Sequence, residues 1–350
     1  MSVPASLSIL DGPYLRDLLD QPRAIAATLA NLPATLGPAA ALDRPRIVLT
    51  GMGSSLHALH PLQLRLVVAG RTACMVETAE LVHSQPALLD ARTLVIAVSQ
   101  SGRSAETLQL LDLIAALSPA ARPLCIGVTN TPDSPLALRA DAVVPTHAGP
   151  EFSVSCKTYL ATLVALEWLG ALLLRADLPA LRSILAPAPD LVAAYLANWS
   201  DHVRELTPLL ADTRSLFLTG RGASLAATCA GALILKESTR QHVEGMSAPA
   251  FRHGPLEMTS PVLTLLAYEG DPATADLNRL LVTDVRAAGG IAALIGPSAD
   301  LAALRLPDVS SSLRPLLEML PAQMVSLSLA LRANREPGRF EHATKVTTTP

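Results

Sequence analysis

Hydroxyl side chains and a glycine follow an apolar run in the first third of the chain and could together hold an anion. The run Thr93–Ala97 is typical of a buried strand, and the segment Val98–Leu108 (VSQSGRSAETL) leads from it into a helical pattern. Gly102 permits a tight turn, and the first amides of the next helix have no acceptor within that helix. The polar side chains of the loop are Ser99, Gln100, Ser101 and Ser104. We therefore predict a phosphate-binding loop.

The residues that are missing from the loop indicate which class of phosphorylated ligand it could bind. No lysine follows the glycine as in nucleotide-binding P-loops, so a small phosphorylated metabolite is favoured over a nucleoside triphosphate. The alternative is a turn rich in serine and glycine that only caps the helix.

A second feature is an internal duplication. Leu49–Ala58 reads LTGMGSSLHA and Leu218–Ala227 reads LTGRGASLAA, so seven of ten positions are identical. Each copy follows an apolar strand and enters a helix, as at the start of a strand–turn–helix unit in a parallel sheet. A nicotinamide dinucleotide is disfavoured, because Leu56 and Leu225 stand where the third glycine of that fingerprint belongs.

Composition excludes several classes of protein. The formal net charge is −3 with no cluster of Lys and Arg, which argues against a nucleic-acid partner. The longest apolar stretch, Leu160–Leu174, is interrupted by Glu167 and is too short to span a membrane, so it predicts a buried helix. No signal peptide is visible, and four scattered cysteines indicate reduced thiols and no metal site. We expect a cytoplasmic protein.

The chain-wide pattern predicts an α/β fold with two parallel sheets, each flanked by helices. The predicted parts are a helical arm (1–36), a first domain (37–185), a second domain (200–335) and a tail (336–350). The expected strands are Ile47–Thr50, Thr93–Val98, Leu124–Thr129, Ala142–Pro145, Ser215–Thr219, Val262–Tyr268 and Gly290–Ile295.

Nine short motifs together resemble one family along nearly the whole chain. They are Gly51–Ser55, Val76–Glu80, Ser99–Thr107, Thr129–Leu136, Pro150–Tyr159, Gly220–Gly222, Leu235–Glu237, Phe251–Pro255 and Lys345–Thr349. This set resembles the double sugar isomerase (SIS) domain family, whose members include the isomerase half of glucosamine-6-phosphate synthase, aminosugar-phosphate deaminases and fructosamine-phosphate deglycases. The resemblance implies two flavodoxin-like, three-layer domains.

The resemblance also implies roles for particular residues. The sugar phosphate would be held by the serine loop (Ser99, Gln100, Ser101, Ser104), by Ser54 and Ser55, and by backbone groups of Val154 and Ser155. Glu237 would move a proton between the first two sugar carbons, which suits a partly desolvated carboxylate. His253 would assist ring opening, and Lys345 would meet the carbonyl carbon as an amine. Family members act as homodimers with the site at the subunit interface and need no metal or organic cofactor.

Some positions depart from the family pattern. The stretch Val154–Lys157 is one residue shorter than usual, Ile234 stands where synthase-type members tend to have a lysine, and the segment before the tail reads REPGRF. Glu237 could also be a solvated helix residue paired with Lys236 or Arg240.

The expected activity is that of an isomerising aminosugar-phosphate deaminase, which turns glucosamine 6-phosphate into fructose 6-phosphate and ammonia. No cysteine nucleophile stands at the N-terminus, so we expect that glutamine is not the nitrogen source. The alternatives are a fructosamine-phosphate deglycase, a plain phosphosugar isomerase, and a non-catalytic sensor of sugar phosphates.

Overall fold

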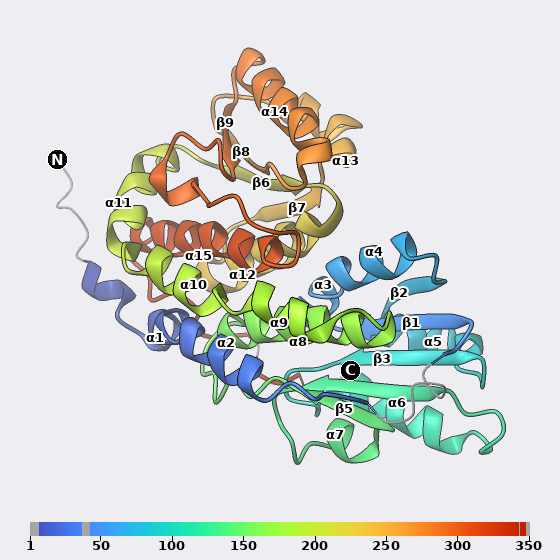
Figure 1. Cartoon of the computed structure of the whole chain (residues 1–350). Coiled ribbons are helices and arrows are strands. Elements are labelled where there is room, and N and C mark those ends of the chain that lie inside the picture. Colours follow the sequence, from blue (N-terminus) through green and yellow to red (C-terminus); the bar gives the residue numbers. More distant parts are fainter. Residues whose placement is uncertain (1–6, 37–42, 343, 348–350) are drawn as a thin grey trace. The chain divides into compact units, whose positions relative to one another are not determined.

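The computed structural model describes residues 7–36, 43–342 and 344–347 (Figure 1). It divides into two compact units, each made from separate stretches of the chain. Unit 1 contains Met1–Pro22, Glu151–Cys156 and Ala188–Phe340, and unit 2 contains Arg23–Pro150, Lys157–Pro187 and Glu341–Pro350. Residues 1–6 of the predicted arm, 37–42 of the predicted first domain, and 343 and 348–350 of the predicted tail lie outside the described residues. The domain boundaries given above stay predictions.

Unit 2 is built on a five-stranded parallel sheet with the strand order β2-β1-β3-β4-β5. Its strands are β1 (Arg46–Gly51), β2 (Ala73–Glu77), β3 (Thr93–Val98), β4 (Leu124–Thr129) and β5 (Ala142–Pro145). Its helical segments are α3 (Ser54–His57), α4 (His60–Val68), α5 (Thr78–His83), η3 (Pro86–Leu88), α6 (Ala105–Ala116), α7 (Pro135–Arg139), α8 (Lys157–Leu173) and α9 (Leu178–Leu185), and α2 (Gln21–Ala30) begins in unit 1 and continues into unit 2.

Helices cover both faces of this sheet because the strands are apolar on both faces. On one face, Leu81 of α5, Leu110 and Ile114 of α6 and Leu136 of α7 pack on Val48 and Val95. On the other face lie α3, α4 and α8, with Leu62 of α4 in contact range of Gly170 of α8. The result is a three-layer domain with the strand order of flavodoxin-like folds.

Unit 1 repeats this plan with a four-stranded parallel sheet in the order β7-β6-β8-β9. Its strands are β6 (Ser215–Gly220), β7 (Val243–Ser247), β8 (Leu263–Tyr268) and β9 (Ile291–Ile295). Its helical segments are η1 (Leu7–Leu10), α1 (Pro13–Leu19), α10 (Ala188–Leu196), α11 (Trp199–Leu209), η4 (Gly222–Ser224), α12 (Leu225–Thr239), α13 (Ala248–Arg252), η5 (Pro255–Met258), α14 (Pro272–Ala287), η6 (Ala302–Leu304) and α15 (Arg314–Arg332).

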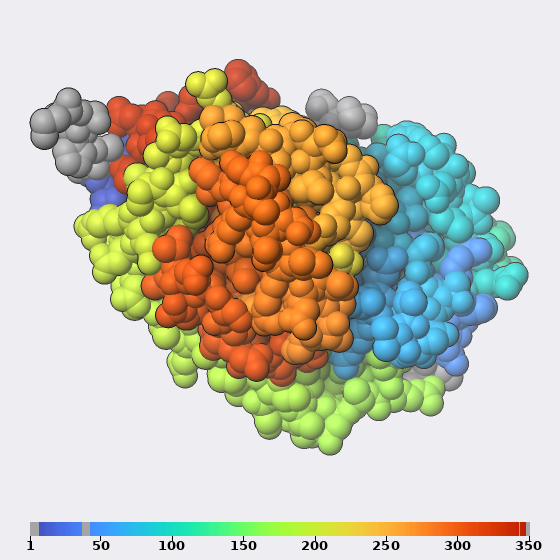
Figure 2. Space-filling view, turned by 90° about the horizontal axis from the view of Figure 1, so that it is seen from above, coloured from blue at the N-terminus to red at the C-terminus, as the bar shows by residue number. Residues whose placement is uncertain are grey.

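The two faces of the second sheet are covered by different helices. Phe251 of α13 and Leu281 and Val285 of α14 pack on Phe217 and Leu265 of the strands. On the other face α12 packs against β6 and β7 and against α15, which is buried along nearly its whole length. The orange atoms of α13 and α14 are seen at the surface of this unit in Figure 2.

The predicted fold class is confirmed, and so is the buried helix predicted from Leu160–Leu174, which is α8. Two edge strands, β2 and β7, were not predicted. Both are half exposed along most of their length, so neither has the apolar run that marks the inner strands. None of the four cysteines, all of which lie in the described residues, forms a disulfide. None of the described helices is both long and apolar enough to cross a lipid bilayer.

Candidate functional site

The serine loop of unit 2 leaves the carboxyl end of β3 and turns sharply into α6. The turn depends on Gly102, whose φ of +61° is in the left-handed region and whose position leaves no room for a Cβ beside Ser134. The Gly102 amide donates to the Ser99 hydroxyl oxygen at 3.1 Å, and the Arg103 amide donates to that of Ser101 at 3.2 Å. Because these serine oxygens accept from the backbone, their hydrogens can be donated to a ligand.

The alternative in which this loop only caps a helix is not supported by the side chain of Ser104. Ser104 is the N-cap residue of α6, but its hydroxyl makes no capping hydrogen bond to the helix. It pairs with the Thr107 hydroxyl at 2.7 Å. Ser99 is buried, whereas Gln100, Ser101 and Ser104 are half exposed.

Ser54 and Ser55 belong to the same edge of the same sheet. The strands β1 and β3 are parallel neighbours, with Gly51 opposite Val98 at their carboxyl ends. The turn after β1 and the serine loop after β3 therefore emerge side by side. Both serines are half exposed at the start of α3, behind Gly53 with a φ of +53°. Unit 2 thus brings together all six side chains predicted to hold a phosphate.

The C-terminal tail lies against this loop. The amide of Ala105, the first residue of α6, donates to the Thr347 carbonyl at 3.1 Å. Lys345 is two residues away and half buried, and the Thr344 hydroxyl donates to the Val346 carbonyl at 2.7 Å, which shapes the chain around the lysine. The described tail residues 341–342 and 344–347 therefore belong to unit 2, the unit that contains the serine loop.

The predicted base, Glu237, lies in the last turn of α12 in unit 1 and its side chain is exposed. The helix ends at Arg240 with a left-handed φ of +58°. Next to Glu237, the carbonyl of Ser238 accepts from the Gly338 amide at 3.3 Å. The end of α12 is therefore tied to the chain segment that leads toward the tail.

The segment Glu151–Cys156 also belongs to unit 1. The Glu151 carboxylate accepts from the Cys156 amide at 2.9 Å, which closes the segment into a loop. Within it Val154 is buried and Ser155 is half exposed. The Ser153 hydroxyl donates to the Gly338 carbonyl at 2.9 Å, so this loop and the end of α12 share one neighbour, Gly338.

Two residues of α1 join this group and were missed by the sequence analysis. Asp17 accepts from the Phe152 amide at 2.8 Å. Tyr14 is fully buried, and burial together with the nearby charges of Cys156, Glu237 and Glu151 raises the pKa of its phenol well above the usual value. No local signal in the sequence distinguishes these two residues, since a tyrosine and an aspartate are ordinary in a short helix and their partners lie more than a hundred residues away.

His253 stands apart from this group. It follows the last residue of α13, its side chain is exposed, and the next residue, Gly254, has a φ of +156°. Its neighbour Arg252 is fixed by an ion pair with Asp284 at 2.7 Å.

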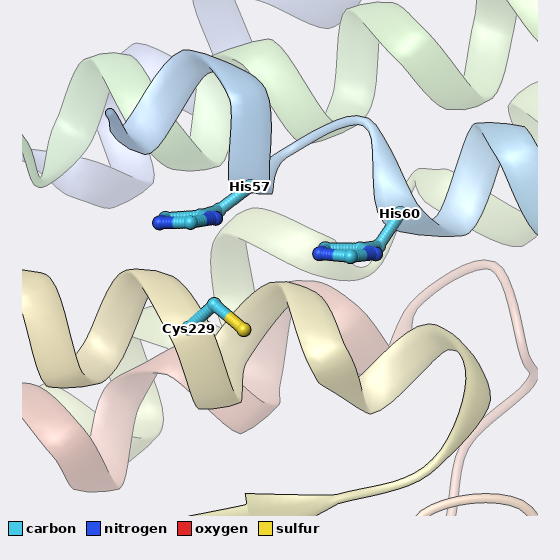
Figure 3. A group of neighbouring side chains, drawn as sticks. All are labelled: His57, His60 and Cys229. Atoms are coloured by element: carbon cyan, nitrogen blue, oxygen red, sulfur yellow. The ribbon is translucent and has the colours of Figure 1, made fainter. Parts of the chain in front are cut away.

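Two further histidines, His57 of α3 and His60 of α4, stack in unit 2 with ring centroids 6.3 Å apart and planes within 5° (Figure 3). Burial lowers the pKa of His60. Cys229, also drawn in Figure 3, belongs to α12 of unit 1, and burial raises its thiol pKa. Within either unit taken alone, the described residues contain no group of three His, Cys, Asp or Glu side chains close enough to bind one metal ion.

Comparison with known proteins gives consistent results. The glutamine–fructose-6-phosphate aminotransferase (isomerizing) of Pyrococcus horikoshii is 30% identical over 346 residues, covering 95% of this chain and 57% of that protein. The enzyme of the same name from Mycobacterium tuberculosis is 29% identical, covering 90% of this chain and 54% of its own length. This chain therefore spans little more than half of these relatives.

Solved structures share the fold. The C-terminal domain of glucosamine-fructose-6-phosphate aminotransferase from Francisella tularensis superposes with a TM-score of 0.82 at 21% identity, covering 92% of this chain and 97% of that one. Glucosamine-6-phosphate deaminase from Thermotoga maritima superposes with a TM-score of 0.79 at 17% identity, covering 97% and 100%. The sequence pattern of the SIS domain matches residues 42–172 and 209–333, and the chain therefore belongs to the SIS domain family.

Proposed function

We propose that this protein is a phosphosugar isomerase-type enzyme, and specifically an isomerising deaminase of aminosugar phosphates. The reaction consumes glucosamine 6-phosphate and water and yields fructose 6-phosphate and ammonia. In this proposal unit 2 binds the phosphate group, and Glu237 of unit 1 carries out the proton transfer.

The observation that carries the proposal is the hydrogen bond from Ala105 to the Thr347 carbonyl. This hydrogen bond joins the serine loop to the C-terminal tail. The serine hydroxyls and helix amides of the loop are suited to bind a phosphate. The tail contains Lys345, the lysine to which we assign a chemical role. The same tail carries Lys345, two residues before Thr347, with its side chain half buried.

The chemistry assigns one step to each residue. His253 passes a proton from the anomeric hydroxyl to the ring oxygen and so opens the ring. Glu237 removes the proton from carbon 2 of the open aldehyde and returns it to carbon 1, while a proton passes from the amino nitrogen to the oxygen on carbon 1, which leaves a hydroxyl-bearing carbon 1 and an imine at carbon 2. The neutral amine of Lys345 adds to carbon 2 and ammonia leaves, which forms a lysine imine, and water then hydrolyses this imine to the ketone and frees Lys345.

The names of the relatives support a phosphosugar substrate, since both matched aminotransferases act by name on fructose 6-phosphate and are called isomerizing. Deglycase and plain isomerase activities remain the alternatives. The shortened segment at Val154–Lys157 favours testing them, because a displaced backbone there would change how the sugar is held.

The direct test is an assay of the purified protein with glucosamine 6-phosphate in which ammonia and fructose 6-phosphate are measured in the same tube. Equal amounts of both products support the deaminase. If neither product forms and the protein instead turns over a fructosamine phosphate or a plain ketose phosphate, the deglycase or the plain isomerase replaces the deaminase as the proposed function.

We also propose a homodimer in which His253 completes the site of the partner subunit. Mixing two inactive variants, Glu237→Gln and His253→Asn, tests this, because each mixed dimer would contain one intact site. Random exchange of subunits should restore about a quarter of wild-type activity. A mixture that stays inactive, while gel filtration shows that subunits exchange, contradicts this arrangement.

A further inference from the structure

The helix α6 begins with backbone amides that have no acceptor within the helix, those of Ala105, Glu106 and Thr107. The first of them, Ala105, donates to the Thr347 carbonyl of the C-terminal tail at 3.1 Å. Among the described residues, none accepts a hydrogen bond from the amides of Glu106 and Thr107, and the Ser104 side chain does not cap them. The start of α6 therefore divides its donors between the tail of the protein and the phosphate that the loop is proposed to bind.

The tail residue that accepts this hydrogen bond follows Lys345 by two positions, and both segments belong to unit 2. Two residues of extended chain span at most about 7 Å, so the Cα of Lys345 lies within that distance of the Cα of Thr347. Just before the anchor, the Thr344 hydroxyl donates to the Val346 carbonyl at 2.7 Å and so turns the chain around the lysine. The backbone is thus restrained on both sides of Lys345.

We propose that Ala105 is a positioning residue for Lys345: its amide holds the tail at Thr347 and so keeps the lysine amine beside a sugar whose phosphate is bound at the same end of α6. The inference rests on the proposed function and deepens it. Addition of an amine to a carbon requires the two atoms to be held about 3–3.5 Å apart, so a tail that leaves its anchor slows this step.

The proposal can be tested at a single hydrogen atom, because a proline at position 105 has no amide hydrogen. Position 105 is the first residue of α6, where a proline fits a helix well. The residue before it, Ser104, has a φ of −62° and a ψ of 151°, which is the extended conformation that precedes a proline. Ala105→Pro should therefore remove the bond to Thr347 and keep the helix. The conservative variant, Ala105→Ser, keeps the amide.

Three readouts separate the anchor from phosphate binding. Amide hydrogen exchange over residues 344–347 reports on the tail in the ligand-free protein. The rise in melting temperature with inorganic phosphate reports on the loop. Sodium borohydride added during turnover of glucosamine 6-phosphate gives a hydride to the carbon of the proposed lysine imine, the nitrogen takes a proton, and the stable secondary amine on Lys345 is measured by mass spectrometry.

In Ala105→Pro we expect faster exchange over 344–347, and about a fivefold loss both in the rate of adduct formation at Lys345 and in kcat, as one lost hydrogen bond implies. Stabilisation by inorganic phosphate should persist, because the serine hydroxyls and the amides of Glu106 and Thr107 are unchanged. Ala105→Ser should restore the exchange and adduct formation of the wild type.

A second variant tests the same bond from its acceptor side and does not depend on how well the proline is tolerated. A chain that ends at Val346 keeps Lys345 and lacks the Thr347 carbonyl, so it should show the same losses as Ala105→Pro. Wild-type adduct formation in either variant overturns the inference. So does an equal loss in Ala105→Ser, or a loss of phosphate stabilisation in Ala105→Pro, which would assign the Ala105 amide to the ligand.

Failure of the inference can be distinguished from failure of the proposed function. If the wild type turns over no phosphosugar, the proposed function fails, and the part of the inference that concerns the reaction fails with it. The exchange experiment needs no substrate and still decides whether Ala105 anchors the tail. That claim is overturned if residues 344–347 exchange equally fast in Ala105→Pro and Ala105→Ser.

Discussion

The turn after β1 and the turn after β6 have nearly the same sequence but different surroundings. In unit 2, Ser55 is half exposed next to the serine loop. In unit 1 its counterpart, Ser224, is buried, and its hydroxyl donates to the Glu318 carboxylate of α15 at 2.9 Å. In unit 1, the Glu318 carboxylate therefore lies beside the turn. In unit 2, we propose that the anion of a ligand binds beside the corresponding turn.

The carboxylate in the second copy is strained electrostatically. Burial raises the pKa of Glu318 to about 7, against smaller opposite effects of the Ser224 hydroxyl and of Arg314. Its second oxygen and the hydroxyl of Tyr268 have no hydrogen-bond partner among the described residues. Burying a carboxylate that is only partly hydrogen-bonded costs free energy, so the second copy keeps the turn sequence but uses its serine hydroxyl to pair a buried carboxylate.

The largest difference between the copies is expected on replacing their loop glycines. Gly102→Ala would force a Cβ onto Ser134 at a positive φ, and the loop would have to move. We expect KM for the phosphosugar to rise about a hundredfold. In unit 1, Gly270→Ala would place a Cβ 2.8 Å from the Ser224 oxygen and should lower the melting temperature with KM unchanged. Equal effects of both variants on KM would contradict the comparison.

A second difference concerns pH. The pKa of Glu318 is raised from 4.5 to about 7 in the folded protein. The favourable contribution of this group to stability is therefore fully present below pH 4.5 and is lost as the pH rises through about 7. Between pH 5 and 7 the wild type should lose about 2 kcal/mol of unfolding free energy from this group. Glu318→Gln should not show this loss. Urea denaturation at several pH values checks it, and parallel curves for the two proteins would refute it.

The smallest effect is expected from the serines themselves. Ser55→Ala should weaken phosphosugar binding about tenfold, because a hydrogen bond to a charged group is lost, and should hardly change stability. Ser224→Ala should leave phosphosugar binding unchanged and destabilise unit 1 by about 1 kcal/mol, because a buried carboxylate loses a hydrogen-bond donor. Thermal shift with and without ligand separates the two outcomes, and a loss of binding in Ser224→Ala would show that the second turn also serves a ligand.

The inner strands could be predicted from the sequence because they are buried on both faces, so that β3 and β8 are apolar apart from one threonine each. The edge strands β2 and β7 are half exposed and give no such pattern. The serine loop could be predicted for a similar reason, since its residues are contiguous and lie between a strand and a helix.

The rest of the candidate site could not be predicted, because it is made by contacts between distant segments. The contact of Asp17 with Phe152 and that of Ser153 with Gly338 depend on where the helices pack. Tyr14 and Ser326 come together across 312 residues. Glu237 was predicted by resemblance alone, since an exposed glutamate near the end of a helix carries no distinguishing pattern of its own.

The central claim is that the two copies divide the work, with phosphate binding in unit 2 and proton transfer at Glu237 of unit 1. The most direct measurement compares Glu237→Gln with Glu257→Gln, an exposed glutamate of the same unit to which we assign no role. We predict that Glu237→Gln loses at least a thousandfold in kcat while glucosamine 6-phosphate still raises its melting temperature as in the wild type, and that Glu257→Gln behaves normally. Substantial turnover by Glu237→Gln, or loss of ligand stabilisation together with activity, would contradict the division.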